Sequence, residues 1–264
     1  MHLSRAIILT AAALCAGCNP LGGHGRGSND GFLAFGAPPT PAEAARWAVD
    51  PNSPDNRQQG ILLLANAVFG GETVYMELYR IALDDEDAAV RAAAVRAMAL
   101  HGGPPEGRLV MERLARSEDP LVRREAARAM TRIHVPESVP LLINAVDPEA
   151  EADAETRALA AEALAQHREP RAVQALIGAL TDTRLLVSSS ARRSLITLTG
   201  VDQGIEPEPW LKWTRTAPDL FAGASTFYYT AYQRDRRILE YVVPWLEPPN
   251  EIPSTPAGMP VEGG

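Results

Sequence analysis

The sequence predicts an all-α solenoid of about five helical hairpins, followed by an aromatic-rich cap. Three observations support this prediction. One motif recurs roughly every 32 residues, and such a period is typical of stacked repeat units. Within each copy, apolar residues recur at i, i+3, i+4 and i+7, which is the helical period. Aromatic residues are concentrated after residue 200, where the repeats stop and the apolar end of a solenoid must be covered.

Five copies of the motif align by eye, and a second apolar stretch follows each of them after a turn, as at 137–146 and 170–180. The unit is therefore a helical hairpin, and we expect the solenoid to span residues 41–200. The copies lie at 54–68, 87–100, 119–133, 153–166 and 184–198, with Arg57, Arg91, Arg123, Arg157 and Ser188 at the equivalent position.

Residues at the expected helix starts support these boundaries. Asp87, Asp119 and Asp153 each stand just before an expected helix, where an aspartate can accept hydrogen bonds from the free amides of the first turn. Thr40 and Glu43 have the spacing of a capping box, with Pro41 in the first turn between them.

The pattern D-x-x-V-R followed by A-x-x-A-L resembles the HEAT repeat, specifically the short HEAT-like repeats first recognised in phycobilisome lyases. The family's Asp and Arg correspond to three pairs here; the first and fifth copies lack one or both, as end repeats often do. The resemblance covers about 41–200 and implies a right-handed solenoid. We interpret the arginines as structural anchors that pair with an aspartate of the same or the adjacent repeat. The three pairs are Asp87 and Arg91, Asp119 and Arg123, and Asp153 and Arg157.

The inner positions of the repeats combine small and large apolar residues. Alanines at equivalent positions allow the helices to approach closely, and larger residues four positions later form an apolar ladder between neighbouring repeats. The alanines are Ala94, Ala126, Ala160 and Ala191, and the ladder residues are Met98, Met130, Leu164 and Leu195.

The N-terminus has the features of an export signal. Arg5 precedes a short apolar run at 6–17 that ends in small residues, so we interpret 1–17 as a signal peptide. Ala16-Gly17-Cys18 resembles the end of the bacterial lipoprotein box, which implies lipid attachment at Cys18, although Cys15 stands where that family usually has Leu. Plain signal cleavage and an uncleaved anchor are the alternatives. Because no second Cys or His pair follows, the C-x-x-C is not interpreted as a zinc site.

The remaining segments are predicted from composition. The glycine content of residues 18–40 predicts a flexible tether, and the proline content of residues 248–264 predicts a disordered tail. Residues 201–247 are the expected cap, with Trp210 and Trp213 packed on the fifth hairpin; an aromatic ligand-binding patch is the alternative.

Composition and motifs narrow the function classes. The net charge of −8 opposes general attraction to nucleic acid, so we expect none as a partner. No hydrolase, metalloprotease or phosphate-binding motif is found, and we expect neither a catalytic site, a metal nor a cofactor. His101, His134 and His167 are spaced 33 residues apart, each at the C-terminal end of a second helix. The helix dipole favours histidine at this end.

One surface pattern suggests a binding site. Arginines on the second helix of each pair, on the presumed concave side, form a basic strip that could bind an acidic protein segment or an anionic envelope polymer. A solvated helix face is the alternative. The strip consists of Arg96, Arg124, Arg128, Arg132 and Arg193.

Together these observations predict an exported, lipid-anchored scaffold of the bacterial cell envelope, on the periplasmic or outer-membrane face, that binds protein partners. Its only expected contact with the membrane is the lipid. The alternative is an enzyme or enzyme auxiliary of the lyase-type HEAT class that handles a small-molecule or chromophore ligand.

Overall fold

The computed structural model describes residues 39–231, 235 and 250–260. The described residues leave out the predicted signal peptide, Cys18 and the tether up to residue 38. They also leave out most of 232–247 in the predicted cap, and 248, 249 and 261–264 of the predicted tail. Contacts divide the chain after residue 39, and the description below concerns the second unit, 40–264.

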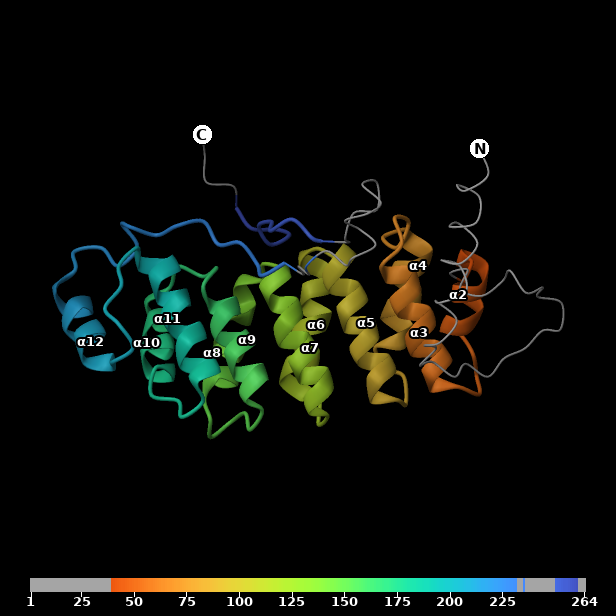
Figure 1. The fold of residues 1–264 in the computed structure, drawn as a ribbon, viewed down its shortest axis with the longest axis horizontal. Helices are drawn as coiled ribbons and strands as arrows, with labels where there is room; N and C mark the ends of the chain where they lie inside the picture. Colours follow the sequence, from red (N-terminus) through yellow and green to blue (C-terminus); the bar gives the residue numbers. More distant parts are fainter. Residues whose placement is uncertain (1–38, 232–234, 236–249, 261–264) are drawn as a thin grey trace, which may run out of the picture. The chain divides into compact units, whose positions relative to one another are not determined.

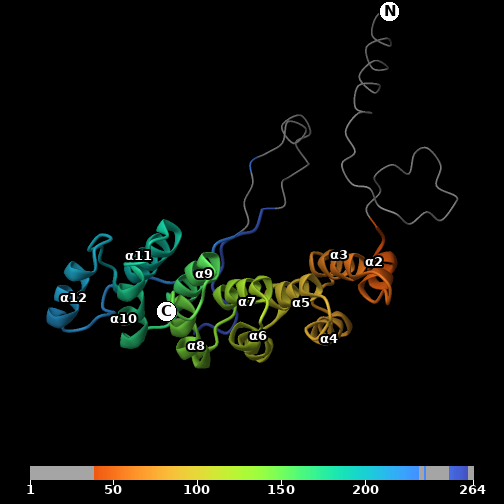
Figure 2. The ribbon, with the colours of Figure 1, turned by 90° about the horizontal axis from the view of Figure 1, so that it is seen from below.

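The described helices lie in two layers (Figures 1 and 2). In the first layer each helix packs on the next, in the order α3 (Pro54–Ala65), α5 (Ala88–His101), α7 (Pro120–Arg132), α9 (Ala154–Leu164) and α11 (Leu185–Thr199). The second layer contains α4 (Thr73–Ala82), α6 (Pro104–Arg116), α8 (Val139–Val146), α10 (Pro170–Ala179) and α12 (Pro207–Thr216). Helix α2 (Pro41–Ala48) packs on α3, and a 3-10 turn (Pro136–Ser138) precedes α8.

The hairpins are α2–α3, α4–α5, α6–α7, α8–α9 and α10–α11, because each helix from α4 to α10 in the second layer packs mainly on the first-layer helix that follows it. The fold is therefore the predicted all-α solenoid of five hairpins. The order within a hairpin differs from the alignment by eye: the apolar stretches at 137–146 and 170–180 belong with the arginine-bearing helix after them, not with the one before.

The predicted helix starts are confirmed. Asp87 accepts hydrogen bonds from the amides of Ala89 and Val90 at 2.8 and 3.1 Å. Asp119 and Asp153 cap α7 and α9 in the same way. At α2, the side chains of the residues at 40 and 43 form the expected capping box.

The core runs between the layers and is built from the predicted residues. The inner alanines and the apolar ladder are all buried, with exposures of 0–1 %. Small residues are required where helices approach most closely: a side chain at Gly60 would collide with the backbone of Ala44 and Ala48 in α2.

After α11 the chain turns at Gly200, whose φ of 73° lies in the left-handed region that favours glycine. A Cβ there would also collide with the carbonyl of Gly223, which packs against this turn. Helix α12 then packs on α10. Trp210 is fully buried, donates to the carbonyl oxygen of Gly204 at 2.9 Å, and meets Trp213 edge to face.

From the turn at Gly223 the chain runs back along the first layer as the C-terminal segment, defined here as residues 223–231 and 250–260. It contacts α11 through Ser225 and α9 through Thr230, which donates to Glu162 at 2.8 Å. Ala257 then pairs with the end of α7, exchanging backbone hydrogen bonds with Arg132 and His134. Residues 250–260 therefore contact the end of α7 in the structure, within the stretch for which the sequence predicts a disordered tail.

Leu164 provides a test of the packing between repeats. It is fully buried between α9 and its neighbours, so Leu164→Ala should lower the free energy of unfolding by about 2–5 kcal/mol through lost burial and the cavity left behind. The control is Leu186→Ala, because Leu186 is 53 % exposed on α11 and should change stability by less than about 0.5 kcal/mol. Denaturant unfolding measures both, and equal losses would contradict the assigned core.

Candidate functional site

An arginine ladder joins successive hairpins at the N-terminal ends of the first-layer helices. The arginine is the fourth residue of α3, α5, α7 and α9. In each case Nη1 donates to carbonyl oxygens of the loop that leads into the same helix. Arg123, for example, donates to Ser117 and Glu118 at 3.1 and 2.8 Å. The guanidinium thus satisfies carbonyls that have no partner in a helix or strand.

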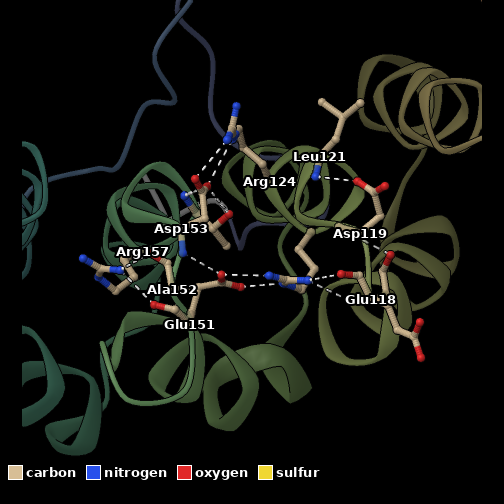
Figure 3. A network of polar contacts seen from close by, with 11 residues as sticks. Glu118, Asp119, Leu121, Arg124, Glu151, Ala152, Asp153 and Arg157 are labelled. Carbon is tan, nitrogen blue, oxygen red and sulfur yellow. Dashed lines mark hydrogen bonds and ion pairs between the residues drawn. The ribbon is translucent and has the colours of Figure 1, made fainter.

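The other edge of the guanidinium, Nε and Nη2, binds a carboxylate in the loop before the next first-layer helix. Arg57 pairs with Asp85 at 2.8 Å, Arg123 with Glu151 at 2.6 Å, and Arg157 with Asp182 at 2.7 Å. Figure 3 shows the loop at the start of α9, where the Glu151 carboxylate lies close to the loop carbonyls that receive Arg157. Two-point arginine–carboxylate contacts of this kind are both strong and geometrically specific.

The same carboxylate also orders its own loop. It stands two residues before the N-cap and accepts a hydrogen bond from the N-cap amide: Asp85 from Asp87, Glu151 from Asp153, and Asp182 from Arg184, at 2.8–2.9 Å. We call this position the carboxylate seat. The sequence predicts pairing with an aspartate of the same or the adjacent repeat, but it does not identify this position, at which one of the three acids is a glutamate. An acid two residues before three of the four N-caps is the signal that could have found it.

Burial and ion pairing oppose each other in the seats. Burial is the largest single influence on the pKa of Glu151 and of Asp182, and it raises both. The hydrogen bonds and charges of Arg123 and Arg157, together with the hydrogen bonds from the N-cap amides, outweigh it, so that both pKa values are lowered. At Asp153, burial is likewise outweighed by hydrogen bonds from Arg124 and Thr156, which lower the pKa to about 2. These carboxylates therefore remain charged at neutral pH.

The five arginines of the predicted basic strip lie on first-layer helices, which are the second helices of their hairpins. Three of them are paired with acids. Arg124 pairs with Asp153 at 2.9 Å, and Arg128 with Glu155 at 2.9 Å. Arg132 pairs with Glu251 of the C-terminal segment, and its guanidinium lies 4.5 Å from the centre of the Tyr229 ring.

The other two strip arginines have no carboxylate partner among the described residues. Arg96 is exposed on α5, and Arg193 on α11 donates to the hydroxyl of Ser190 at 2.9 Å. The strip is therefore largely neutralised by acids of α9 and of the C-terminal segment.

A groove of about 490 Å3 lies over α5, α7 and α9 on the outer face of the first layer. It contains three of the strip arginines, together with Glu125, Glu162 and Glu251, and Thr230 and Ala231 of the C-terminal segment form one border. We call it the outer groove.

Polar side chains near the C-terminal ends of the first-layer helices connect neighbouring repeats. His101 Nε2 lies 2.7 Å from the carbonyl oxygen of Ala65 at the end of α3, and Gln166 donates to the carbonyl of Met130 in α7. The rings of His134 and His167 stack, with centroids 4.8 Å apart. Burial, and secondarily the charges of His134 and Arg171, lowers the pKa of His167 to about 3. No group of three or more metal ligands occurs in the part of the chain that the structure describes.

The buried rung of the ladder should carry most of its stability. The Arg157 and Asp182 side chains are 7 % and 3 % exposed, so Arg157→Met should lower the free energy of unfolding by about 3–5 kcal/mol, because a buried charge and two carbonyls lose their partner. The control is Arg192→Met, in an ion pair with Asp202 whose two side chains are each 43 % exposed. This change should have a far smaller effect. Chemical denaturation compares them, and similar losses would contradict a structural role for the ladder.

Comparisons with known proteins agree with this architecture. Residues 107–196 match the family model of HEAT repeats. No curated protein matches the chain. Among solved structures, YibA of Escherichia coli is similar at 24 % identity and a TM-score of 0.48, over 59 % of this chain and 58 % of that one. The complex of CpcE and CpcF of phycocyanin lyase from Nostoc sp. is similar at 19 % identity and a TM-score of 0.41, over 65 % of this chain and 82 % of that one. The residues that match the HEAT-repeat model thus lie within α6 to α11, the third to fifth hairpins of the all-α solenoid.

Proposed function

We propose that this protein is an exported, lipid-anchored scaffold that binds protein partners in the outer groove. The HEAT repeats supply a class of fold that generally mediates protein–protein interactions, because stacked repeats create extended surfaces. The groove adds a specific place on that surface, and its lining suggests what the partner offers.

The observation that carries the proposal is that an extended piece of chain already packs on this face and forms one border of the groove (Figure 1). At Arg132, the C-terminal segment supplies a carboxylate from Glu251 and an aromatic ring from Tyr229. The segment also donates a hydrogen bond to α9 through Thr230 and pairs its backbone with the end of α7 through Ala257. An extended polypeptide with acidic and aromatic side chains is therefore the kind of ligand that this face accommodates.

The unoccupied part of the groove points to the same chemistry. Arg96 lines it and has no carboxylate partner among the described residues, while Arg128 is 42 % exposed in its ion pairs. Leu100 and Leu159 also line the groove and add apolar surface for contact. A partner segment with an acidic residue flanked by apolar or aromatic ones complements this lining.

The anchoring part of the proposal rests on the N-terminal sequence. No helix among the described residues is long and apolar enough to cross a bilayer. The small residues Ala16 and Gly17 directly precede Cys18, and together the three residues resemble a lipoprotein processing site.

Two cysteine substitutions test the anchor. Cys18→Ser should abolish incorporation of a fatty-acid analogue during metabolic labelling, because it removes the thiol that carries the lipid. Cys15→Ser is the matched control and should remain labelled. A wild-type chain without label, or a label lost equally in both variants, would contradict lipid attachment at Cys18.

Charge reversal tests the partner-binding face. Arg96→Glu, Arg128→Glu and Arg193→Glu together should abolish capture of partners from envelope extract, because the groove and its surroundings then repel acidic segments. Capture by the wild-type chain should also weaken as salt is raised. The control combines Arg80→Glu, Arg108→Glu and Arg171→Glu on the second layer, where the side chains are 43–56 % exposed.

The readout is pull-down with mass spectrometry, with circular dichroism to confirm that both triple variants fold. Partners retained by the first-layer variant, or lost equally in both, would contradict the assignment of this face. Purification of the wild-type chain with a bound coloured or small-molecule ligand would favour the enzyme-auxiliary interpretation instead.

A further inference from the structure

The ladder has one rung without a carboxylate. The seat stands two residues before the N-cap, and at α7, whose N-cap is Asp119, that position is Ser117. Arg91, which would pair with it, donates through Nη1 to the carbonyls of Asp85 and Glu86 at 2.7 and 2.9 Å, in the manner of the other rungs. Its Nε and Nη2 bond to no acceptor among the described residues. The arginine is thus oriented as elsewhere, but its carboxylate is missing.

A second donor is left over at the same place. In the other three loops the N-cap amide donates to the seat carboxylate. The amide of Asp119 has no such acceptor in the described chain. The Ser117 hydroxyl, which stands in place of the carboxylate, instead donates to the carbonyl oxygen of Asp119 at 3.4 Å. Two guanidinium N–H groups and one backbone amide, which elsewhere bind one carboxylate, are therefore all without an acceptor here.

The vacant seat opens on a pocket rather than on packed protein. Arg91, Ser117 and Asp119 line a cavity of about 550 Å3 at the start of α7, near the residues drawn in Figure 3. Arg113 and Arg116 line it as well. Arg113 pairs with Asp84 at 2.8 Å, but its Nε is buried without an acceptor. Arg116 is exposed and makes no ion pair with a described residue.

The lining also limits what can bind. Glu112, Glu118 and Asp119 are part of the pocket, so a highly charged anion such as a polyphosphate would meet repulsion. A single carboxylate does not need a uniformly basic pocket: Asp85 and Glu151 occupy their seats although an N-cap aspartate stands two residues away. The planar two-point geometry of the arginine edge also matches a carboxylate.

From these observations we infer that the gap in the ladder is a binding site for one external carboxylate, held by Arg91 Nε and Nη2 and by the amide of Asp119. The carboxylate takes the place that Glu151 and Asp182 fill at the other rungs. It is supplied either by a small carboxylic acid or by an acidic side chain of a bound polypeptide. This inference is independent of the outer groove, which is near the opposite ends of the helices.

The test supplies a carboxylate from the protein itself at the position of Ser117. Ser117→Glu places the carboxylate that the neighbouring rung has, whereas Ser117→Ala leaves the seat empty. In 1H–15N spectra of the isotopically labelled protein, acetate at constant ionic strength should shift the Asp119 amide and the Arg91 Nε–H signals saturably in the wild type and in Ser117→Ala. Affinity should fall by at least about tenfold in Ser117→Glu and in Arg91→Gln. Ser117→Glu should also raise the midpoint of thermal unfolding by about 2–4 °C.

A second titration identifies the source of the carboxylate. A short peptide with one glutamate, compared with its glutamine version, should bind more tightly than acetate if the natural ligand is a polypeptide side chain. Binding no tighter than that of acetate assigns the site to a small carboxylic acid. Signals that do not saturate with acetate in the wild type, or that respond equally in Ser117→Glu, would overturn the inference and leave a seat filled only by water. Either result leaves the charge-reversal test of the groove unaffected.

Discussion

The array depends on a guanidinium group that joins three parts of the chain at once. Each ladder arginine reaches back to the loop carbonyls before its own helix, and all but Arg91 also bind a carboxylate before the next first-layer helix. That carboxylate in turn holds the amide at which the next helix is capped. Burial of the Arg157–Asp182 pair is tolerated because every polar atom of this junction finds a partner. One contact thus sets both the start of a helix and the spacing between hairpins, and apolar packing fills what lies between.

The sequence predicts the features that repeat locally and misses those that link distant residues. The helical spacing of apolar residues, the N-caps and the inner alanines can each be recognised within one helix, and all of them are found in the structure. The seat carboxylates lie 25–28 residues beyond their arginines, in loops that an alignment of helices leaves out. The order of helices within a hairpin is equally invisible, because periodicity identifies a buried face but not the neighbour that covers it.

The ion pairs of the basic strip also join residues that are distant in the sequence. Viewed along single helices, Arg124, Arg128 and Arg132 form a row of positive charge. Their partners come from the first turn of α9 and from residue 251, and neither proximity follows from helical spacing. The expectation of a disordered tail at 248–264 rested on its five prolines and on the lack of apolar periodicity. Proline removes a backbone donor but leaves the carbonyl, and one alanine among the prolines suffices for the paired contact at the end of α7.

The buried histidine of the stacked pair makes the stability of the array depend on pH. Folded, His167 remains neutral down to about pH 3, whereas an unfolded chain would protonate it near its ordinary value of 6.5. Between those values the unfolded state binds one more proton at this residue, so its contribution to stability decreases as pH falls through that window. The joint between the third and fourth hairpins therefore weakens with acidification. The ladder carboxylates at the opposite ends of these helices have lowered pKa values, so they keep their charge below the pH at which such groups are ordinarily protonated. Acid would loosen one edge of the solenoid before the other.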